Sequence, residues 1–287
     1  MQLVSYNIQF GRGKDGRVDL PRIAAEIDSA DVIALQEVDR FWARSDMTDQ
    51  VAALSALLPD RHVAYGPGVD EDGSLADSSG RVLRRRRQFG NLLLSRHPIL
   101  AVRNHLLPKL NLLDQLSLQR SALECVIACP NGPARIYSVH LGHVSSAERL
   151  RQTQRLRAIH REAREDGGVR SGPSPAWDRQ APPPPTADGA ILLGDFNMEP
   201  ETPEYIELTG LADARKYGRV TAMDGFVDAW ERAGQGGSGA TKFDPGGQRR
   251  IDYAFVSAGL APRIRGVRVD NAAEGSDHQP LWLEIDL

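Results

Sequence analysis

The sequence contains few cysteines and few aromatic residues. Cys125 and Cys129 are the two cysteines among 287 residues, and aromatic side chains make up 6% of the chain. A disulfide between them is possible but not required, and a zinc site is disfavoured because no further cysteine or suitable histidine cluster lies nearby. We therefore expect two reduced, structural thiols. The hydrophobic content of 41% supports a sizeable buried core.

An excess of charge of one sign and long apolar runs are also missing. The formal net charge is −3. This is not the basic balance of a dedicated nucleic-acid-binding protein, although a local basic patch can suffice. No apolar run approaches the roughly 18 residues that a membrane span requires. Residues 1–8 resemble a strand and not the basic and apolar leader of a secreted protein. A cytoplasmic location is expected if Met1 is the native start.

Short apolar or alternating runs predict more strands than helices. The predicted strands are Gln2–Ile8, Val32–Gln36, His62–Tyr65, Gly90–Ser95, Ile99–Leu106, Ser121–Ala128, Ala134–His140, Ile191–Gly194, Tyr253–Ser257, Ile264–Val269 and Pro280–Ile285. The predicted helices are Leu20–Ser29, Asp49–Leu58, Ser146–Arg164 and Glu204–Leu208. Many strands form adjacent antiparallel pairs, which favours a two-sheet core with helices outside it.

Two segments are rich in turn-forming residues. Residues 165–189 include the run Pro182–Pro185 and are typical of an irregular loop. Residues 234–247, which are rich in glycine, predict a second flexible loop. Because candidate motifs lie on both sides of residues 165–189, we expect a single domain over residues 1–287 with an insertion at that place.

The most informative motif is Gly-Asp-Phe-Asn at residues 194–197, directly after an apolar run. Polar side chains just past a strand end can line a cleft while the sheet holds them rigid. Asp195 could take a proton or hold a metal-bound water, and Asn197 could donate hydrogen bonds to a developing oxyanion. Alone the motif is weak, because glycine, aspartate and asparagine are ordinary turn residues.

Further polar residues lie at or beside strand-like runs along the whole chain. They are Asn7, Glu37, His140, Asp252, Asp277 and His278. With residues 194–197 in this order, the chain resembles the endonuclease/exonuclease/phosphatase superfamily, the metal-dependent phosphodiesterases similar to pancreatic deoxyribonuclease and to apurinic endonucleases. The resemblance extends from residue 3 to residue 286. It implies a four-layered α/β sandwich, in which two packed mixed sheets carry helices on both outer faces and catalytic groups at one end.

The resemblance implies a site for Mg²⁺ or Mn²⁺. Glu37 matches the glutamate of the family's Gln-Glu-Val motif and is predicted to be the main metal ligand. Asn7 matches an asparagine of the first strand, which lies close to that metal. Asp277 is predicted to complete the metal shell or to hold a second ion. Magnesium prefers such oxygen ligands together with water and substrate phosphate.

The resemblance also implies the groups that move protons. His278 is predicted to contact the scissile phosphate, with Asp252 fixing its tautomer. Asp195 is predicted to position or deprotonate the water, and Asn197 to hold a phosphoryl oxygen. Sequence leaves open whether Asp195 or the His278–Asp252 pair is the base. His140 matches a histidine of the deoxyribonuclease and sphingomyelinase branches, and is predicted to contact phosphate or protonate the leaving oxygen.

Four residues are candidates for substrate binding. Arg120 precedes a predicted strand and could bind a phosphate oxygen bidentately or form a surface salt bridge. Asn91 matches a family position near the cleft, and a scaffold hydrogen bond is its simpler interpretation. Arg84 and Arg86 lie in the dense basic run that ends at Arg87. That run is either a solvated arm or a surface that attracts a polyanion or an anionic lipid headgroup.

These observations predict a Mg²⁺- or Mn²⁺-dependent phosphoesterase that hydrolyses a phosphodiester. A nuclease is the simplest hypothesis for its substrate. A phospholipid-headgroup or small-molecule phosphodiesterase or phosphatase is the alternative, and no obligate protein partner is indicated. A non-catalytic binding module on the same fold is the alternative from a different class. It is disfavoured because none of the expected metal-binding or histidine positions is missing.

Overall fold

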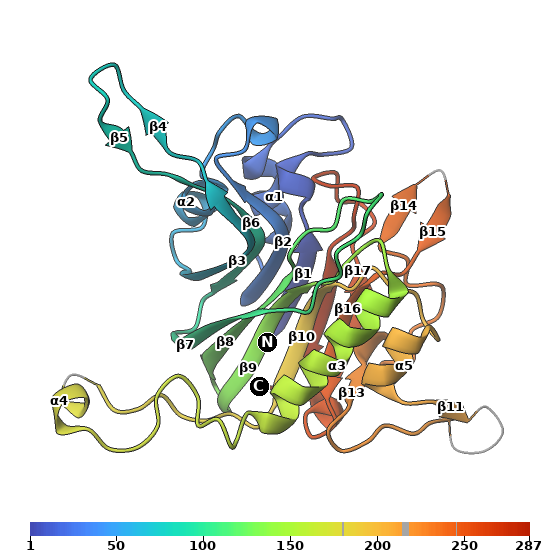
Figure 1. The fold of residues 1–287 in the computed structure, drawn as a ribbon. Coiled ribbons are helices and arrows are strands. Elements are labelled where there is room, and N and C mark those ends of the chain that lie inside the picture. Colours follow the sequence, from blue (N-terminus) through green and yellow to red (C-terminus); the bar gives the residue numbers. More distant parts are fainter. Residues whose placement is uncertain (180, 214–217, 245) are drawn as a thin grey trace.

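The computed structural model describes residues 1–179, 181–213, 218–244 and 246–287. Two six-stranded sheets pack face to face, and helices cover both outer faces (Figure 1). Each sheet contains one parallel pair among antiparallel neighbours, so both are mixed. The predicted four-layered α/β sandwich is confirmed.

The first sheet brings together the N-terminal and C-terminal thirds of the chain. Its strands, in spatial order, are β17 (Ile264–Val269), β18 (Leu281–Ile285), β1 (Gln2–Asn7), β2 (Val32–Arg40), β6 (Arg86–Ser95) and β3 (His62–Asp72). Strands β1 and β2 are parallel. Strands β3 and β6 run well past their predicted ends, because their solvent-facing halves lack the apolar pattern on which the prediction depended.

The second sheet is formed by the middle of the chain and two later strands. Its strands, in spatial order, are β13 (Phe226–Asp228), β16 (Asp252–Ser257), β10 (Ala190–Asp195), β9 (Gly132–His140), β8 (Ser121–Cys129) and β7 (Ile99–Leu106). Strands β9 and β10 are parallel. Aliphatic side chains from both sheets meet in a shared core, which includes Leu93 and Leu193. Cys125 and Cys129 are buried and unpaired in that core.

Helices close the two outer faces. On the first sheet lie α1 (Leu20–Ile27) and α2 (Gln50–Leu57), and on the second lie α3 (Ser146–Glu162) and α5 (Pro203–Thr209). Helix α1 buries Ile23 and Ile27 on one face, and Asp19 caps it by accepting a hydrogen bond from the backbone N–H of Arg22 at 3.0 Å. Ser145 caps α3 in the same way.

Smaller elements decorate the sandwich. They are η1 (Gln9–Gly11), η2 (Ala43–Ser45), η3 (Ala261–Arg263), α4 (Pro175–Asp178), α6 (Ala229–Arg232) and three hairpins, β4 (Leu75–Ala76) with β5 (Val82–Leu83), β11 (Ala212–Asp213) with β12 (Gly218–Arg219), and β14 (Lys242–Asp244) with β15 (Gly247–Arg249). The prediction of a flexible loop over residues 234–247 is therefore wrong for Lys242–Asp244 and Gly247, which lie in paired strands; residue 245 lies outside the described residues. Composition alone does not reveal the backbone pairing of Lys242 with Arg249.

The topology collects the predicted site at one end of the sandwich. Strand β1 ends at Asn7, opposite Gln36 of the parallel strand β2, which continues to Arg40. In the second sheet, Asp195 at the end of β10 pairs with His140 and with Asp252. The segment at residues 165–189, which the sequence predicts to be an insertion, precedes the first residue of β10 and so lies at the opposite end of the sheet (Figure 1). Within the described residues, no helix is long and apolar enough to cross a membrane.

Glycine at position 194 is required by the close approach of β9. A Cβ atom added there would lie 1.9 Å from the carbonyl oxygen of Val139, a backbone atom that cannot move without displacing the strand. We expect Gly194→Ala to lower the free energy of unfolding by about 3 kcal/mol. Urea denaturation followed by circular dichroism measures this change.

The matched control is Gly266→Ala in β17. A Cβ atom at Gly266 meets its nearest neighbour, Glu284, at 3.8 Å, which is ordinary contact. The control is expected to change the free energy of unfolding by about 1 kcal/mol or less. Equal stability of the two variants would show that β9 and β10 do not approach as closely as described.

Candidate active site

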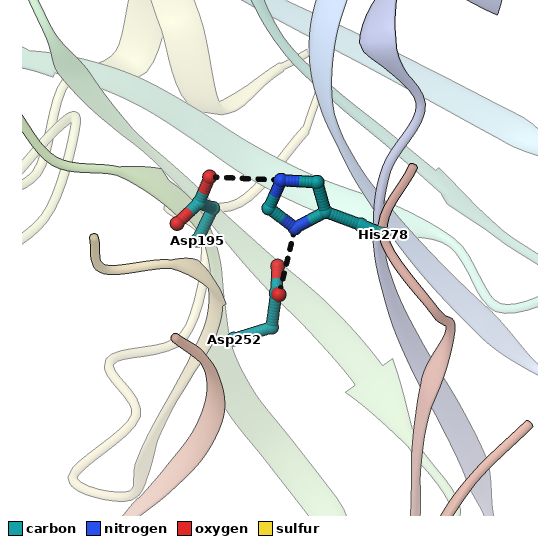
Figure 2. Close-up of side chains that lie close together, drawn as sticks. All are labelled: Asp195, Asp252 and His278. Atoms are coloured by element: carbon teal, nitrogen blue, oxygen red, sulfur yellow. Dashed lines mark hydrogen bonds and ion pairs between the residues drawn. The ribbon is translucent and has the colours of Figure 1, made fainter. Parts of the chain in front are cut away.

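His278 lies between two buried aspartates at the centre of the site. Its Nδ1 is 2.8 Å from Oδ2 of Asp252, and its Nε2 is 3.8 Å from Oδ2 of Asp195 (Figure 2). All three side chains are almost fully buried. Burial alone would lower the pKa of His278, but the carboxylates of Asp252 and Asp195 outweigh it and raise this pKa to about 9. The two carboxylates therefore favour the protonated imidazole, and the ammonium of Lys242, 3.1 Å from Nε2, opposes it.

Asp195 is held by donors from both sheets. Its Oδ2 accepts a hydrogen bond from Nδ2 of Asn7 at 2.9 Å, and its Oδ1 accepts one from the backbone N–H of Asn197 at 2.9 Å. Burial, and next the negative charge of Asp252, raise the pKa of Asp195 above its usual range. A carboxylate with a raised pKa is a better proton acceptor.

His140 is kept neutral by its surroundings. Burial and the adjacent Arg120 lower the pKa of His140 well below its ordinary value. Arg120 can only donate, and its Nη1 lies 3.1 Å from Nδ1 of His140, so Nδ1 is the acceptor and Nε2 carries the hydrogen. That Nε2 is 3.5 Å from Oδ2 of Asp195 and 3.2 Å from Nδ2 of Asn197, which can donate to the carbonyl of Leu141 instead. His140 thus presents a neutral N–H donor to the site.

Glu37 occupies a strained position in β2. Its φ of 60° lies in the left-handed region, at the irregularity in pairing between Leu35 and Val38. A left-handed backbone is unfavourable for a residue with a side chain and is often retained at functional sites. The carboxylate accepts a hydrogen bond from Nδ2 of Asn7 at 3.2 Å, so Asn7 joins Glu37 to Asp195.

Asp277 is tied to residues that the sequence did not single out. Its Oδ2 accepts hydrogen bonds from Nζ of Lys242 at 2.6 Å and from Nε2 of Gln9 at 3.2 Å. Asn7 and Glu37 contact each other directly. Asp277 is joined to Asn7 through Gln9, whose backbone N–H donates to Oδ1 of Asn7 at 3.0 Å. The position of Gln9 two residues after Asn7 is the one feature of the sequence that could have indicated a role for it. Lys242 lies in the segment predicted to be a flexible loop.

The predicted substrate-binding residues lie in three different places. Arg120 is almost fully buried, and its two terminal nitrogens face His140 and His143, each at 3.1 Å. Asn91 donates to the backbone carbonyl of Ser121 at 2.8 Å, which ties β6 to β8 in the manner of a scaffold residue.

The other two arginines belong to the arm formed by residues 70–87. Arg84 is exposed directly after β5, and Arg86 pairs with Asp70 at 2.7 Å. The hairpin of this arm projects from the sandwich (Figure 1). The contacts described here tie Arg86 to the arm itself and not to the predicted catalytic or metal-binding residues.

The cluster of Asp195, Asp252 and His278 has its ligand atoms within 4.8 Å of one another. Metal binding by an imidazole requires a free nitrogen lone pair. Nδ1 of His278 faces Asp252 and Nε2 faces the ammonium of Lys242, so neither ring nitrogen offers a free lone pair and this cluster fits proton transfer better than metal binding. The carboxylates of Glu37 and Asp195 converge on the neutral amide of Asn7, and His278 lies 3.8 Å from that of Asp195. Hard oxygen ligands that converge in this way fit a divalent cation.

The chain has clear similarity to one family and to several solved structures. The sequence model described as "Endonuclease/Exonuclease/phosphatase family" matches residues 4–278. A comparison with curated protein sequences found no match. Among solved structures, an endonuclease/exonuclease/phosphatase from Beutenbergia cavernae is 22% identical with a TM-score of 0.65, and the alignment covers 100% of this chain and 71% of that one.

Two similar structures carry more specific names. A mannosyl-6-phosphatase from Bacteroides thetaiotaomicron is 18% identical with a TM-score of 0.62, and the alignment covers 100% of both chains. A 3' phosphatase from Neisseria, bound to a product DNA hairpin, is 18% identical with a TM-score of 0.58, again over 100% of both chains. At these identities the likeness supports the fold and not a particular substrate.

Replacing Asp252 by asparagine is expected to lower the pKa of His278 from about 9, because the imidazolium loses the carboxylate that stabilises it. His278 would then release its proton at a lower pH. NMR titration of the histidine ring protons in EDTA measures this change, with His278→Ala identifying the resonance. A pKa that is the same in wild type and Asp252→Asn would contradict the arrangement in Figure 2.

Proposed function

The chain belongs to the endonuclease/exonuclease/phosphatase family, whose members hydrolyse phosphoester bonds, and from that premise we propose that it is a metal-dependent phosphoesterase that cleaves a phosphodiester. One observation carries the proposal. A buried carboxylate with a raised pKa, Asp195, lies between a protonated imidazole, His278, and a neutral imidazole donor, His140. This arrangement supplies a base, a cationic donor and a neutral donor around one point.

A divalent cation fits beside Glu37. We propose Glu37 as its main ligand, with Asn7 and Asp277 completing the shell. Ligation by Asn7 requires its carboxamide to turn, because Oδ1 accepts from Gln9 and Nδ2 faces the two carboxylates. Mg²⁺ or Mn²⁺ bound there would offset the negative charge of the phosphoryl group. The oxygen-rich ligand set favours these ions over softer metals.

Asp195 is the residue that we propose as general base. Near neutral pH a sufficient fraction of its carboxyl groups is ionised to accept a proton. Its raised pKa increases the driving force for taking that proton from water. His278 is assigned the opposite role, because a protonated imidazole donates. The proton on its Nε2 would stabilise a phosphoryl or leaving oxygen, while Asp252 holds the ring through Nδ1.

His140, Asn197 and Arg120 are proposed to receive the phosphoryl oxygens. The neutral N–H of His140 and the carboxamide of Asn197 lie next to each other and act as preorganised dipoles. Arg120 fixes the tautomer of His140 and places a buried positive charge behind it. Arg120 therefore influences phosphate binding by orienting His140.

A nucleic acid is the substrate that we place first, with Arg84 and Arg86 on the arm as candidate phosphate contacts outside the centre. A phosphomonoester, or another small-molecule or phospholipid-headgroup ester, is the second candidate. The observation that favours it is that two similar structures are named as phosphatases. Steep salt dependence of polynucleotide binding would support the first candidate.

We expect the protein to hydrolyse bis(p-nitrophenyl) phosphate with Mn²⁺ or Mg²⁺ and to lose this activity in EDTA. His278→Ala removes the cationic donor and should lower kcat by about 100-fold or more. The readout is the absorbance of released p-nitrophenolate at about 405 nm. Full activity of His278→Ala would contradict the proposed role of this histidine.

Glu37→Ala is expected to remove the stabilisation that the cation provides. Ligands that bind the folded state raise the melting temperature, so millimolar Mg²⁺ should raise that of the wild type and not that of the variant. Glu284→Ala is the matched control, because Glu284 is exposed in β18 at the end remote from the site. An undiminished Mg²⁺ response in Glu37→Ala would place the metal elsewhere.

A further inference from the structure

Lys242 reaches into the candidate active site from the β14–β15 hairpin. Its Nζ lies 2.6 Å from Oδ2 of Asp277 and 3.1 Å from Nε2 of His278. The side chain retains 18% of its exposure, so the ammonium is largely desolvated but remains open to the site. The sequence analysis assigned no role to this position.

The backbone around Lys242 is anchored to the catalytic residues. Thr241 is fully buried, and its Oγ1 accepts a hydrogen bond from the backbone N–H of Asp252 at 3.1 Å. Its carbonyl accepts one from the backbone N–H of Gln279 at 2.6 Å. Lys242 itself forms an isolated antiparallel bridge with His278. The lysine is therefore held opposite the imidazole by the same backbone that positions His278 and Asp252.

Nζ of Lys242 and Nε2 of His278 are close enough to bind the same substrate atom. Nδ1 of His278 faces Asp252, so Nε2 is the ring atom that is left to meet a substrate. Nζ lies 3.1 Å from that atom. Two nitrogens this close can both lie within hydrogen-bond distance of one substrate oxygen.

We propose that Lys242 is a further catalytic residue, whose ammonium binds the same phosphoryl oxygen that His278 contacts. Phosphoryl transfer is accelerated chiefly by fixed positive charges and donors around the phosphoryl oxygens. In the substrate-free protein, Asp277 holds the ammonium in place. A simple role in tethering the hairpin would need the contact with Asp277 but not the placement of Nζ beside Nε2 of His278.

This inference rests on the proposed phosphoesterase function, and its test separates the two. Lys242→Met, which keeps the length of the chain without its charge, and Lys242→Arg are compared with the wild type at saturating Mg²⁺ or Mn²⁺. One readout is kcat/KM for bis(p-nitrophenyl) phosphate. The other is the dissociation constant of inorganic phosphate, measured by calorimetry, which does not depend on turnover. Lys242→Gln is the second neutral variant if the methionine variant fails to fold.

We expect the neutral variant to lower kcat/KM by about 100-fold and to weaken phosphate binding by about tenfold, with arginine restoring part of both. The melting temperature should change little. Lys14→Met is the matched control, because Lys14 pairs with Glu274 at the surface and should leave both readouts unchanged.

Two results would overturn the inference. One is a neutral variant that binds phosphate and turns over the diester as the wild type does. The other is a wild type that hydrolyses the diester but loses the same activity in Lys14→Met as in Lys242→Met, which would indicate a general charge effect. A wild type that binds phosphate through Lys242 yet cleaves no phosphoester would refute the proposed function and leave the inference about phosphate binding intact.

Discussion

The hydrogen bond between Asn7 and Asp195 is the contact on which the candidate site depends. It joins the end of β1 in one sheet to the end of β10 in the other, between side chains that are both buried. A buried carboxylate is costly unless it is hydrogen-bonded, so Asp195 needs this donor. Displacing one sheet past the other by the rise of a single residue, about 3.3 Å along a strand, would break the contact. The site can therefore form only when the two sheets pack in this register.

A second buried contact supports the same register. Nε2 of Gln36 in β2 donates to Oγ of Ser138 in β9 at 3.0 Å, and that hydroxyl donates to the carbonyl of Leu35 at 2.9 Å. Two residues further along these strands lie Val38 and His140. Together with the apolar core between the sheets, the hydrogen bonds of Asn7 with Asp195 and of Gln36 with Ser138 fix the position of one sheet along the other. The two histidines then receive opposite protonation states from fixed neighbours, His140 from Arg120 and His278 from Asp252.

The sequence predicts the sandwich well because its signals are local. Most strands and the four main helices follow from apolar periodicity, and the motif residues stand at strand ends that parallel topology brings to one edge. Asp195 and His140 illustrate this, since they pair directly across β9 and β10. The metal set remains a prediction, because the structure links Asp277 to Lys242 and Gln9 and not directly to Glu37.

Lys242 shows why the rest could not be predicted. Its position depends on a backbone hydrogen bond between Thr241 and Gln279 and on pairing across the hairpin, both of which join residues that composition treats separately. The run of turn-forming residues before it predicts flexibility, and no periodic pattern marks a strand of three residues. The orientation of Arg120 toward two histidines is likewise a consequence of packing between β8 and the loop after β9.

The two buried thiols of β8 give the molecule an intrinsic probe of its own opening. Cys125 and Cys129 lie in the core between the sheets, and burial raises the pKa of the Cys129 thiol to about 11 and that of Cys125 further. Only the thiolate reacts at an appreciable rate with alkylating agents. Labelling of Cys125, which has no exposed surface, would therefore require the core around it to open. The rate of alkylation would report how often the register described above is lost, without any added chromophore or substitution.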